Sequence, residues 1–287
     1  MMKKILFYIL HVINMLRCKK IMYENRNKIY KYDAAICAIA KCEDDYLEEW
    51  IDYHLQIGFQ HIFLVDNNDS DSVEKLLNKY VDEGYLTILP FRGIPHVQAQ
   101  AYEYVTQFYG EETKWLALID IDEFFVMKRH NSIIQLLKEY EDIPSISVNW
   151  LCFGCNGHIC KSEGDVVKRF TRPASLSKSN LINYAVKSII RPSIFIKIYD
   201  ASFRNVHRWS LPTFNEKRQI IHQNTHKPSY ECLYINHYYT KSYEEFKKKR
   251  QRGTAMFKMS TQDYDSFFLV NEKELEKDID IYENSLL

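Results

Sequence analysis

The sequence lacks a net charge: its 38 lysines and arginines equal its 38 aspartates and glutamates. A chain without a global positive field gives no sign of binding nucleic acid. Glycine- and proline-rich stretches are also missing, since eight glycines and seven prolines occur among 287 residues. Because no internal repeat and no low-complexity linker divides the chain, we expect one continuous domain.

Cysteines are few and show no metal-binding pattern. There are seven, and the cluster of Cys152, Cys155 and Cys160 has no second Cys/His pair at zinc-finger spacing to complete a four-ligand site. An odd number of scattered cysteines favours reduced thiols, which indicates a cytoplasmic protein and not a disulfide scaffold.

Long apolar runs are absent too. The segment 5–16 holds about a dozen mostly apolar residues, too few to span a bilayer. No small-residue cleavage site of a signal peptide follows it. The basic residues around it are Lys3, Lys4, Arg17, Lys19 and Lys20. We expect residues 1–20 to form an amphipathic helix, either docked on the protein or resting on the anionic inner face of a membrane.

From Asp33 onward, short apolar strands alternate with amphipathic helices. The predicted strands are 34–40, 61–65, 86–89 and a run that starts at Trp115. The predicted helices are 43–56, one that begins at the Asp71/Glu74 capping box, and one from Pro95 to Tyr109. Their predicted buried faces are Leu47, Trp50, Ile51 and Leu55, then Val73, Leu76, Leu77 and Tyr80, then Val97, Ala101, Val105 and Phe108. This order predicts an α/β fold with a parallel sheet and right-handed crossovers.

The fourth predicted strand stops at two aspartates, Asp120 and Asp122. Ligands of open α/β sheets bind beyond the carboxyl ends of the strands. Two carboxylates so close together repel each other unless a positive charge lies between them. A divalent metal that carries a diphosphate fits this position. The alternative is a strand end that is acidic by chance.

The pattern becomes less regular after Asn131. Short strands are predicted at 145–150, 166–170, 188–190 and 195–198. Ser132 caps one helix, and Ser242 with Glu245 opens another that stops at Gly253. We therefore divide the chain into a lead segment (1–32), a nucleotide-binding half (33–130) and an irregular acceptor-binding half (131–287).

Seven segments occur in an informative order. They are 41–58 (KCEDDYLEEWIDYHLQIG), 66–71 (DNNDSD), 120–125 (DIDEFF), 150–158 (WLCFGCNGH), 187–192 (KSIIRP), 207–208 (HR) and 235–253 (INHYYTKSYEEFKKKRQRG). Together they resemble GT-A glycosyltransferases, above all family 92 and its bacterial family 2-like relatives. The resemblance implies a GT-A (Rossmann-like) nucleotide-sugar-binding fold. It also implies inverting transfer from a nucleoside diphosphate sugar, of the UDP-sugar class, to a glycan or lipid-linked acceptor. The metal would be Mn²⁺ or Mg²⁺, and a bacterial product would be surface polysaccharide or lipopolysaccharide.

The resemblance assigns the metal ligands. Asp122 is expected to bind the metal, and Asp120 to hold the ribose or the same metal. His237 corresponds to the C-terminal histidine that completes the metal shell in many GT-A folds, since neutral imidazole suits Mn²⁺. A structural role is the alternative for His237. Glu123 is interpreted either as the start of a helix or as a carboxylate that supports the ligands, and it is assigned no catalytic role.

Donor contacts are expected around the same edge of the sheet. Glu43 and Asp66 follow the first two strands and are candidates to face the nucleotide, although a helix N-terminus and an ordinary Asx turn are alternatives. Arg92, Gln98 and Tyr102 follow the third strand and are expected to face the donor cleft, with a structural role as the alternative for each. Lys241 and Arg252, with Lys249 as a weaker candidate, could neutralise the diphosphate or form a solvated basic face.

The catalytic base is expected among acidic residues of the second half. Glu163 and Asp165 are the assigned candidates, and Asp200 is a third. The alternative is that Glu163 and Asp165 only form a turn beside Gly164. Trp150, Phe153 and Trp209 could stack on sugars or pack in the core.

Two rival functions remain at this point. A haloacid-dehalogenase-like phosphatase also uses D-x-D, but after an early strand and with Thr or Val where this chain has Phe124. A degenerate member that binds nucleotide or glycan without turnover is the non-enzyme alternative.

Overall fold

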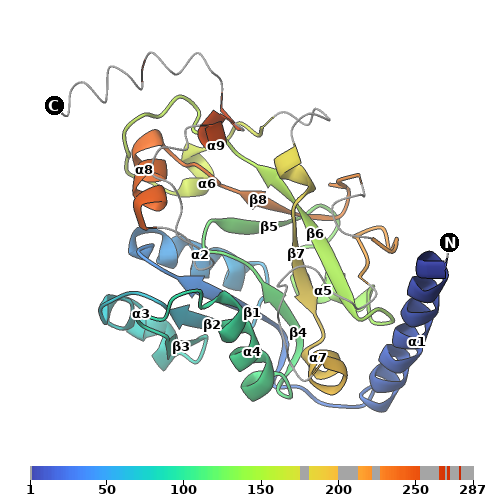
Figure 1. Ribbon diagram of the computed structural model, residues 1–287. Helices are drawn as coiled ribbons and strands as arrows, with labels where there is room; N and C mark the ends of the chain where they lie inside the picture. Colours follow the sequence, from blue (N-terminus) through green and yellow to red (C-terminus); the bar gives the residue numbers. More distant parts are fainter. Residues whose placement is uncertain are drawn as a thin grey trace.

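The computed structural model describes residues 2–174, 181–199, 213–221, 227–252, 265–268, 270–271 and 278, with the side chains from residue 12 onward (Figure 1). The strands are β1 (Tyr32–Ala40), β2 (His61–Asp66), β3 (Leu86–Pro90), β4 (Thr113–Leu118), β5 (Glu123–Met127), β6 (Ser145–Cys152), β7 (Val186–Ile190) and β8 (Leu233–His237). The helices are α1 (Met2–Glu24), α2 (Asp44–Gln56), α3 (Ser72–Asp82), α4 (Gln98–Tyr109), α5 (Ile133–Lys138), α6 (Val166–Arg169), α7 (Pro192–Tyr199), α8 (Tyr243–Arg252) and α9 (Asp265–Phe268), with a 3-10 turn η1 (Leu181–Tyr184).

A mixed sheet of eight strands runs through the molecule in the order β3-β2-β1-β4-β7-β6-β8-β5. Strands β1 to β4 pair in parallel, which requires the crossovers that α2, α3 and α4 provide. β7 then pairs with β4 and with β6 in antiparallel fashion, and β8 lies between β6 and β5. The predicted α/β class is confirmed, with a parallel first half and a less regular second half.

Both faces of the sheet are covered by helices, because successive strand residues point to opposite sides. In β1, Ala34 and Ile36 face a core built with α2, α3 and α5, whereas Ala35 and Cys37 face a second core built with α4 and α7. A strand buried on both faces reads as a continuous apolar run, as β1 does.

Two predicted strands are wrong. Residues 166–170 contain helix α6, and residues 195–198 lie within helix α7. A segment of four or five residues is too short for its periodicity to separate a strand from a short helix. Pro192 occupies the first position of α7, where its missing N–H costs nothing.

Some predicted details of the helices are also wrong. Leu76 and Phe108 are exposed, because each lies at the margin of the apolar stripe of its helix. Helix α4 begins at Gln98 and not at Pro95. Asp71 stands before α3, but its side chain makes an ion pair with Lys75 and caps no backbone N–H.

The lead segment forms helix α1, and its last turns dock on α7. Cys18 and Ile21 are buried in the second core, and the Asn25 side-chain amide donates to Ser193 Oγ at 3.2 Å. Further towards the N-terminus, apolar side chains point outward: Val12, Ile13 and Leu16 are 56%, 46% and 63% exposed. Among the described residues, no helix combines the length and the hydropathy needed to cross a membrane.

Candidate functional site

The two aspartates of the D-x-D motif occupy different environments. Both lie in the connection between β4 and β5, which begins where pairing with β1 ends at Leu118. The Asp122 side chain is 4% exposed and the Asp120 side chain is 41% exposed. The inner aspartate therefore belongs to a desolvated cluster and the outer one faces the surface.

Asp122 lies between a histidine and a lysine from the C-terminal part of the chain. Its Oδ2 is 3.5 Å from His237 Nε2 and 2.5 Å from Lys249 Nζ. The pairing of β5 with β8 places His237 opposite Glu123, directly beside the motif. Burial alone would raise the pKa of Asp122, but Lys249 and His237 hold it well below its ordinary value. Burial lowers the pKa of His237, so this imidazole is neutral at neutral pH and free to act as a ligand.

Asp120 is instead paired with Lys187, a buried lysine of β7. Lys187 Nζ is 2.6 Å from Asp120 Oδ2 and 3.4 Å from Glu123 Oε1. Glu123 Oε2 also accepts the backbone N–H of Asp120 at 2.9 Å. Burial opposes the charge on Lys187, but the two carboxylates raise its pKa above the ordinary value. Lys187 begins the segment 187–192, but no pattern in the sequence predicts its contact with Asp120.

Three side chains could hold a metal ion. Asp122, Glu123 and His237 each offer one ligand atom, and these atoms lie within 4.8 Å of one another. Carboxylate oxygen and imidazole nitrogen suit Mn²⁺, and carboxylate oxygen suits Mg²⁺. Glu123 Oε1 is buried and accepts no hydrogen bond within the described part of the chain, and its 3.4 Å contact with Lys187 Nζ is a long ion pair. Cys152 Sγ lies 3.8 Å from His237 Nδ1 on the other side of the ring.

The residues present thus fit a divalent cation. The possible ligands are Asp122, Glu123 and His237, whereas the sequence predicted Asp120, Asp122 and His237. The predicted Asp122 and His237 are brought together. Glu123 directly follows the D-x-D motif and is the first residue of β5. Which way its side chain points could not be predicted without knowing where β5 begins.

Cations from the C-terminal part surround this group. Arg252 Nη2 is 2.8 Å from Glu43 Oε1, while Arg252 Nε and Nη1 are buried without a hydrogen-bond partner among the described residues. Lys241 is buried, and its ammonium lies 4.1 Å from the centroid of the Tyr46 ring. Lys249, ranked lowest of the three by sequence analysis, makes the contact with Asp122.

Asp66 and Arg92, predicted separately as donor contacts, form an ion pair at the end of β2. Asp66 is fully buried and accepts from the backbone and side-chain nitrogens of Asn68 at 3.0 and 2.8 Å, and from Arg92 Nε at 3.2 Å. Asn68 in turn accepts the backbone N–H of Cys42 at 2.5 Å. These bonds join the loops after β1 and β2, so Asp66 organises both loops.

Gln98 and Tyr102 are buried on α4. The side-chain amide of Gln98 donates to the Tyr102 hydroxyl at 3.4 Å. Burial raises the pKa of Tyr102, with Lys187 and Asp120 nearby. Tyr102 thus packs in the core between α4 and the sheet, near the Asp120–Lys187 pair.

Glu163 and Asp165, the candidate bases, lie in the loop before α6. Glu163 is exposed, and Asp165 forms an ion pair with Lys168 at 2.5 Å at the start of that helix. Within the described part of the chain, no hydrogen bond or ion pair joins either residue to Asp122, Glu123 or His237, so their role stays a prediction. The third candidate, Asp200, lies outside the described residues, as do His207, Arg208 and Trp209.

Trp150 is the aromatic residue that the structure brings to the site. Its ring centroid is 4.2 Å from that of His237, and its Nε1–H is buried without a partner in the described part of the chain. Phe153 packs instead against Tyr238, at 5.1 Å between centroids, and is nearly buried.

Comparison with known proteins gives a family match over most of the chain. The model of glycosyltransferase family 92 matches residues 36–270. Family 92 proteins of Ricinus communis and Oryza sativa are each 26% identical to this chain, over 249 and 235 residues. These matches cover 82% and 81% of this chain but 40% and 37% of the relatives, so the chain spans about two-fifths of their length.

Among solved structures, TarS 1–349 of S. aureus in complex with UDP-GlcNAc has a TM-score of 0.42 and 10% identity, covering 76% of this chain and 64% of that chain. The complex of TarS 1–349 with UDP has a TM-score of 0.37 and 13% identity, covering 58% and 49%. A likeness at this level says nothing about the substrates of the present chain.

Proposed function

The chain belongs to glycosyltransferase family 92, and from this premise we propose that it transfers a sugar from a nucleoside diphosphate sugar, of the UDP-sugar class, to a glycan or lipid-linked acceptor. Every assigned site residue lies within the matched range 36–270. Family membership removes the phosphatase interpretation. The relatives named above are plant proteins and lend a lipopolysaccharide pathway no support, so the proposed acceptor is limited to a glycan or a lipid-linked sugar chain.

The observation that carries this proposal is a set of buried donors that lack a partner beside the metal-ligand group. They are Arg252 Nε and Nη1 and Trp150 Nε1, all unpaired within the described part of the chain. Buried N–H groups are nearly always satisfied, so a ligand with several acceptor oxygens is expected here. A diphosphate supplies such oxygens.

The charges of the site support the same ligand. Four carboxyl groups face four basic groups: Glu43, Asp120, Asp122 and Glu123 against Lys187, Lys241, Lys249 and Arg252. Burial raises the pKa of Glu123 well above its ordinary value and lowers the pKa of Lys241, so one carboxyl group and one amine both shift towards their neutral forms. The protein part is therefore close to neutral by itself. A divalent cation together with a diphosphate bearing two negative charges would enter without adding net charge, which limits the electrostatic cost of burial.

Each protein group then has a defined task. Asp122, Glu123 and His237 would hold Mn²⁺ or Mg²⁺, and the chemistry such an ion supplies is stabilisation of charge on the departing diphosphate. Lys241, Lys249 and Arg252 would bind the diphosphate oxygens. Asp120, Asp66, Arg92 and Glu43 would contact the ribose and base or orient the loops that do.

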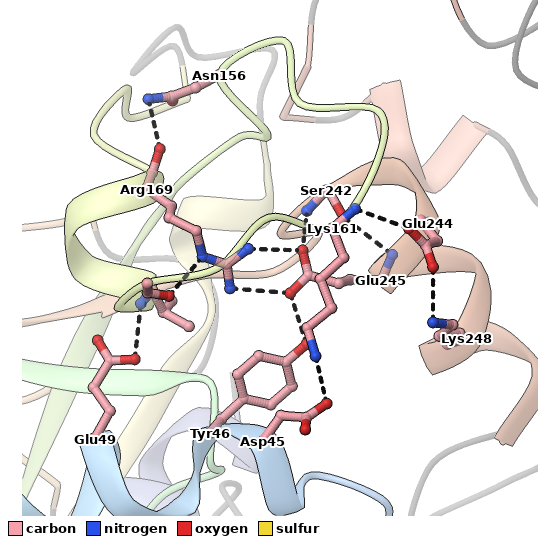
Figure 2. Close-up of polar contacts among 12 residues, drawn as sticks. Asp45, Tyr46, Glu49, Asn156, Lys161, Arg169, Ser242, Glu244, Glu245 and Lys248 are labelled. Atoms are coloured by element: carbon pink, nitrogen blue, oxygen red, sulfur yellow. Dashed lines mark hydrogen bonds and ion pairs between the residues drawn. The ribbon is translucent and has the colours of Figure 1, made fainter.

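The acceptor side remains a prediction from sequence. An acceptor hydroxyl attacks the anomeric carbon on the face opposite the diphosphate, and inversion follows. We assign the proton of that hydroxyl to Glu163 or Asp165, whose loop packs against α2 and α8 (Figure 2).

We also propose that the protein acts at the inner face of a membrane through α1. The apolar side chains Val12, Ile13 and Leu16 are exposed beside Arg17, Lys19 and Lys20. Exposed apolar residues flanked by lysine and arginine suit an anionic interface.

A thermal-shift panel of UDP-, GDP-, CMP- and dTDP-sugars, each with and without Mn²⁺, tests the donor class. A ligand at 100 times its dissociation constant stabilises the folded state by about 2.7 kcal/mol. We expect UDP-sugars to stabilise the protein, and to do so only when Mn²⁺ is present. Equal shifts with all four nucleotides, or none with any, would contradict the proposal. Binding of UDP-sugar without turnover would favour the degenerate, non-catalytic alternative.

A further inference from the structure

A group of buried polar residues joins helix α8 to helix α2 and to the chain around α6, outside the metal-ligand group (Figure 2). Its centre is Glu245, which is 5% exposed. The Glu245 carboxylate accepts the Tyr46 hydroxyl at 2.6 Å and both terminal nitrogens of Arg169 at 3.1 Å. We refer to Tyr46, Arg169 and Glu245 as the clamp.

The clamp also fixes the first turn of α8. Glu245 Oε2 accepts the backbone N–H of Ser242 at 3.0 Å, and Ser242 Oγ accepts the backbone N–H of Glu245 at 3.2 Å. This reciprocal pair is the capping box predicted from the sequence. Arg169 is itself held by Nε, which donates to the carbonyl oxygen of Gly164 at 2.9 Å.

The cations of the site lie at fixed offsets from the clamp. Lys249 and Arg252 follow Glu245 by four and seven residues, which places all three on one face of α8. Lys249 reaches Asp122 and Arg252 reaches Glu43. Lys241 precedes the capping box and lies over the ring of Tyr46, whose hydroxyl contacts Glu245.

We propose that Tyr46, Arg169 and Glu245 are positioning residues that fix α8 and so hold Lys241, Lys249 and Arg252 at the diphosphate of the donor. This inference rests on the proposed donor site. None of the three clamp residues needs to touch the ligand, because each acts through the placement of α8.

The energetics of the buried Arg169–Glu245 ion pair favour a role in positioning α8 over a role in stability alone. Arg169 and Glu245 side chains are 7% and 3% exposed. The desolvation of two charges offsets much of their attraction, so such pairs contribute little net stability. A bidentate Arg–carboxylate pair does impose geometry, and a shift of α8 would move Lys249 and Arg252 together. Lys241, just before the helix, is held by the ring of Tyr46.

A matched pair of variants tests the inference. Glu245→Gln weakens the clamp, and Glu216→Gln is the control. Glu216 is an equally buried carboxylate remote from α8, which accepts the Ser229 hydroxyl and the backbone N–H groups of Glu231, Cys232 and Leu233. Calorimetry with UDP and Mn²⁺ gives the dissociation constant, and thermal unfolding gives Tm.

We expect Glu245→Gln to weaken UDP binding about tenfold and Glu216→Gln to change it less than about twofold, while both lower Tm. The two mutations Glu245→Gln and Lys249→Ala should be non-additive: without the lysine, loss of the clamp costs about threefold or less. Tyr46→Phe, which keeps the ring under Lys241, should weaken binding about threefold and covers the case that Glu245→Gln does not fold.

Equal effects of Glu245→Gln and Glu216→Gln on UDP binding, or full additivity with Lys249→Ala, would overturn the clamp while leaving the donor site in place. For a Glu245→Gln protein that does not fold, unchanged binding by Tyr46→Phe would overturn it. Absence of UDP binding by the unmodified protein would instead remove the proposed function, and the clamp with it.

Discussion

At the scale of single residues, Asp122 is the carboxylate on which the account depends. It is the buried member of the D-x-D pair and contacts both His237 and Lys249. We predict that Asp122→Asn lowers glycosyl transfer at least about a hundredfold, because a neutral amide neither holds a dication nor balances Lys249. Transfer and Mn²⁺ affinity should fall together. Asp142→Asn, at an exposed aspartate paired with Arg218, is the control and should leave both unchanged.

His237 provides a separate test of the metal group. If its Nε2 is a ligand, His237→Ala should weaken Mn²⁺ binding about ten- to a hundredfold or more, the range that even indirect losses reach. His130→Ala, at a histidine paired with Glu139 away from the group, should change nothing. Unaltered Mn²⁺ affinity and turnover in His237→Ala would make it a structural histidine packed on Trp150.

The residues of the site were predictable where a motif states the position and not where strand pairing creates it. Asp122 and His237 could be named because the family resemblance gives their motif positions a role as metal ligands. Lys187 and Glu123 also lie in such segments, 187–192 and 120–125, but the resemblance gives neither of them a contact. Lys187 reaches Asp120 only because β7 is inserted antiparallel beside β4. Glu123 reaches the group because β5 pairs with β8. Neither pairing has a local signal in the sequence.

At the scale of elements, helix α2 buries a histidine on its apolar face. His54 donates from Nδ1 to the carbonyl oxygen of Trp50 and is enclosed by aromatic rings. Burial lowers its pKa to about 3 from 6.5. Between these values the unfolded chain binds more protons than the folded one, so stability is complete above pH 6.5 and falls on acidification.

We therefore predict that the free energy of unfolding falls by about 2 kcal/mol because of His54 when the pH is lowered from 6.5 to about 5, at 1.36 kcal/mol per pKa unit. Denaturant unfolding of His54→Leu should show an acid-induced loss that is smaller by this amount. His61, whose pKa burial lowers to about 4, should keep contributing in that variant. An unchanged pH dependence would mean that His54 is not held neutral.

Helix α1 makes a prediction about membranes. Ile13→Asp with Leu16→Asp should abolish sedimentation of the full chain with anionic vesicles, while the docked end at Cys18 and Ile21 stays intact. Phe108→Asp, at another exposed apolar side chain, should pellet like the unmodified protein. Binding should weaken with salt, because exposed charge attraction is screened. No pelleting of any of the three proteins would assign α1 to the fold alone.

Elements with long periodic or continuous apolar patterns were predicted correctly, and two of the shorter ones were not. β1, β2, β4 and α2 have one clear pattern each. Helices α6 and α7 are four and eight residues long and rich in valine and isoleucine, which also suit strands. Whether such a segment forms a helix or a strand depends on its tertiary contacts. In α6, for example, the Glu49 carboxylate accepts the N–H groups of Val166 and Val167.

At the scale of the whole molecule, the sheet places residues from both halves of the chain at one point. β4 leads to the aspartates, β7 and β8 carry Lys187 and His237, and α8, which follows β8, adds Lys249 and Arg252. The parallel half was predictable from its alternation of strand and helix. The order of β5 to β8 was not, because antiparallel strands separated by long irregular segments can be inserted in several ways.

The central claim is that this arrangement uses a dication to transfer or release a sugar from a nucleoside diphosphate. The most direct test measures release of UDP from UDP-sugars by the unmodified protein and by Asp122→Asn, with Mn²⁺ and with excess chelator. We predict UDP release by the unmodified protein with Mn²⁺ only, and none above background by the variant. Equal release in chelator, or full release by Asp122→Asn, would contradict the account.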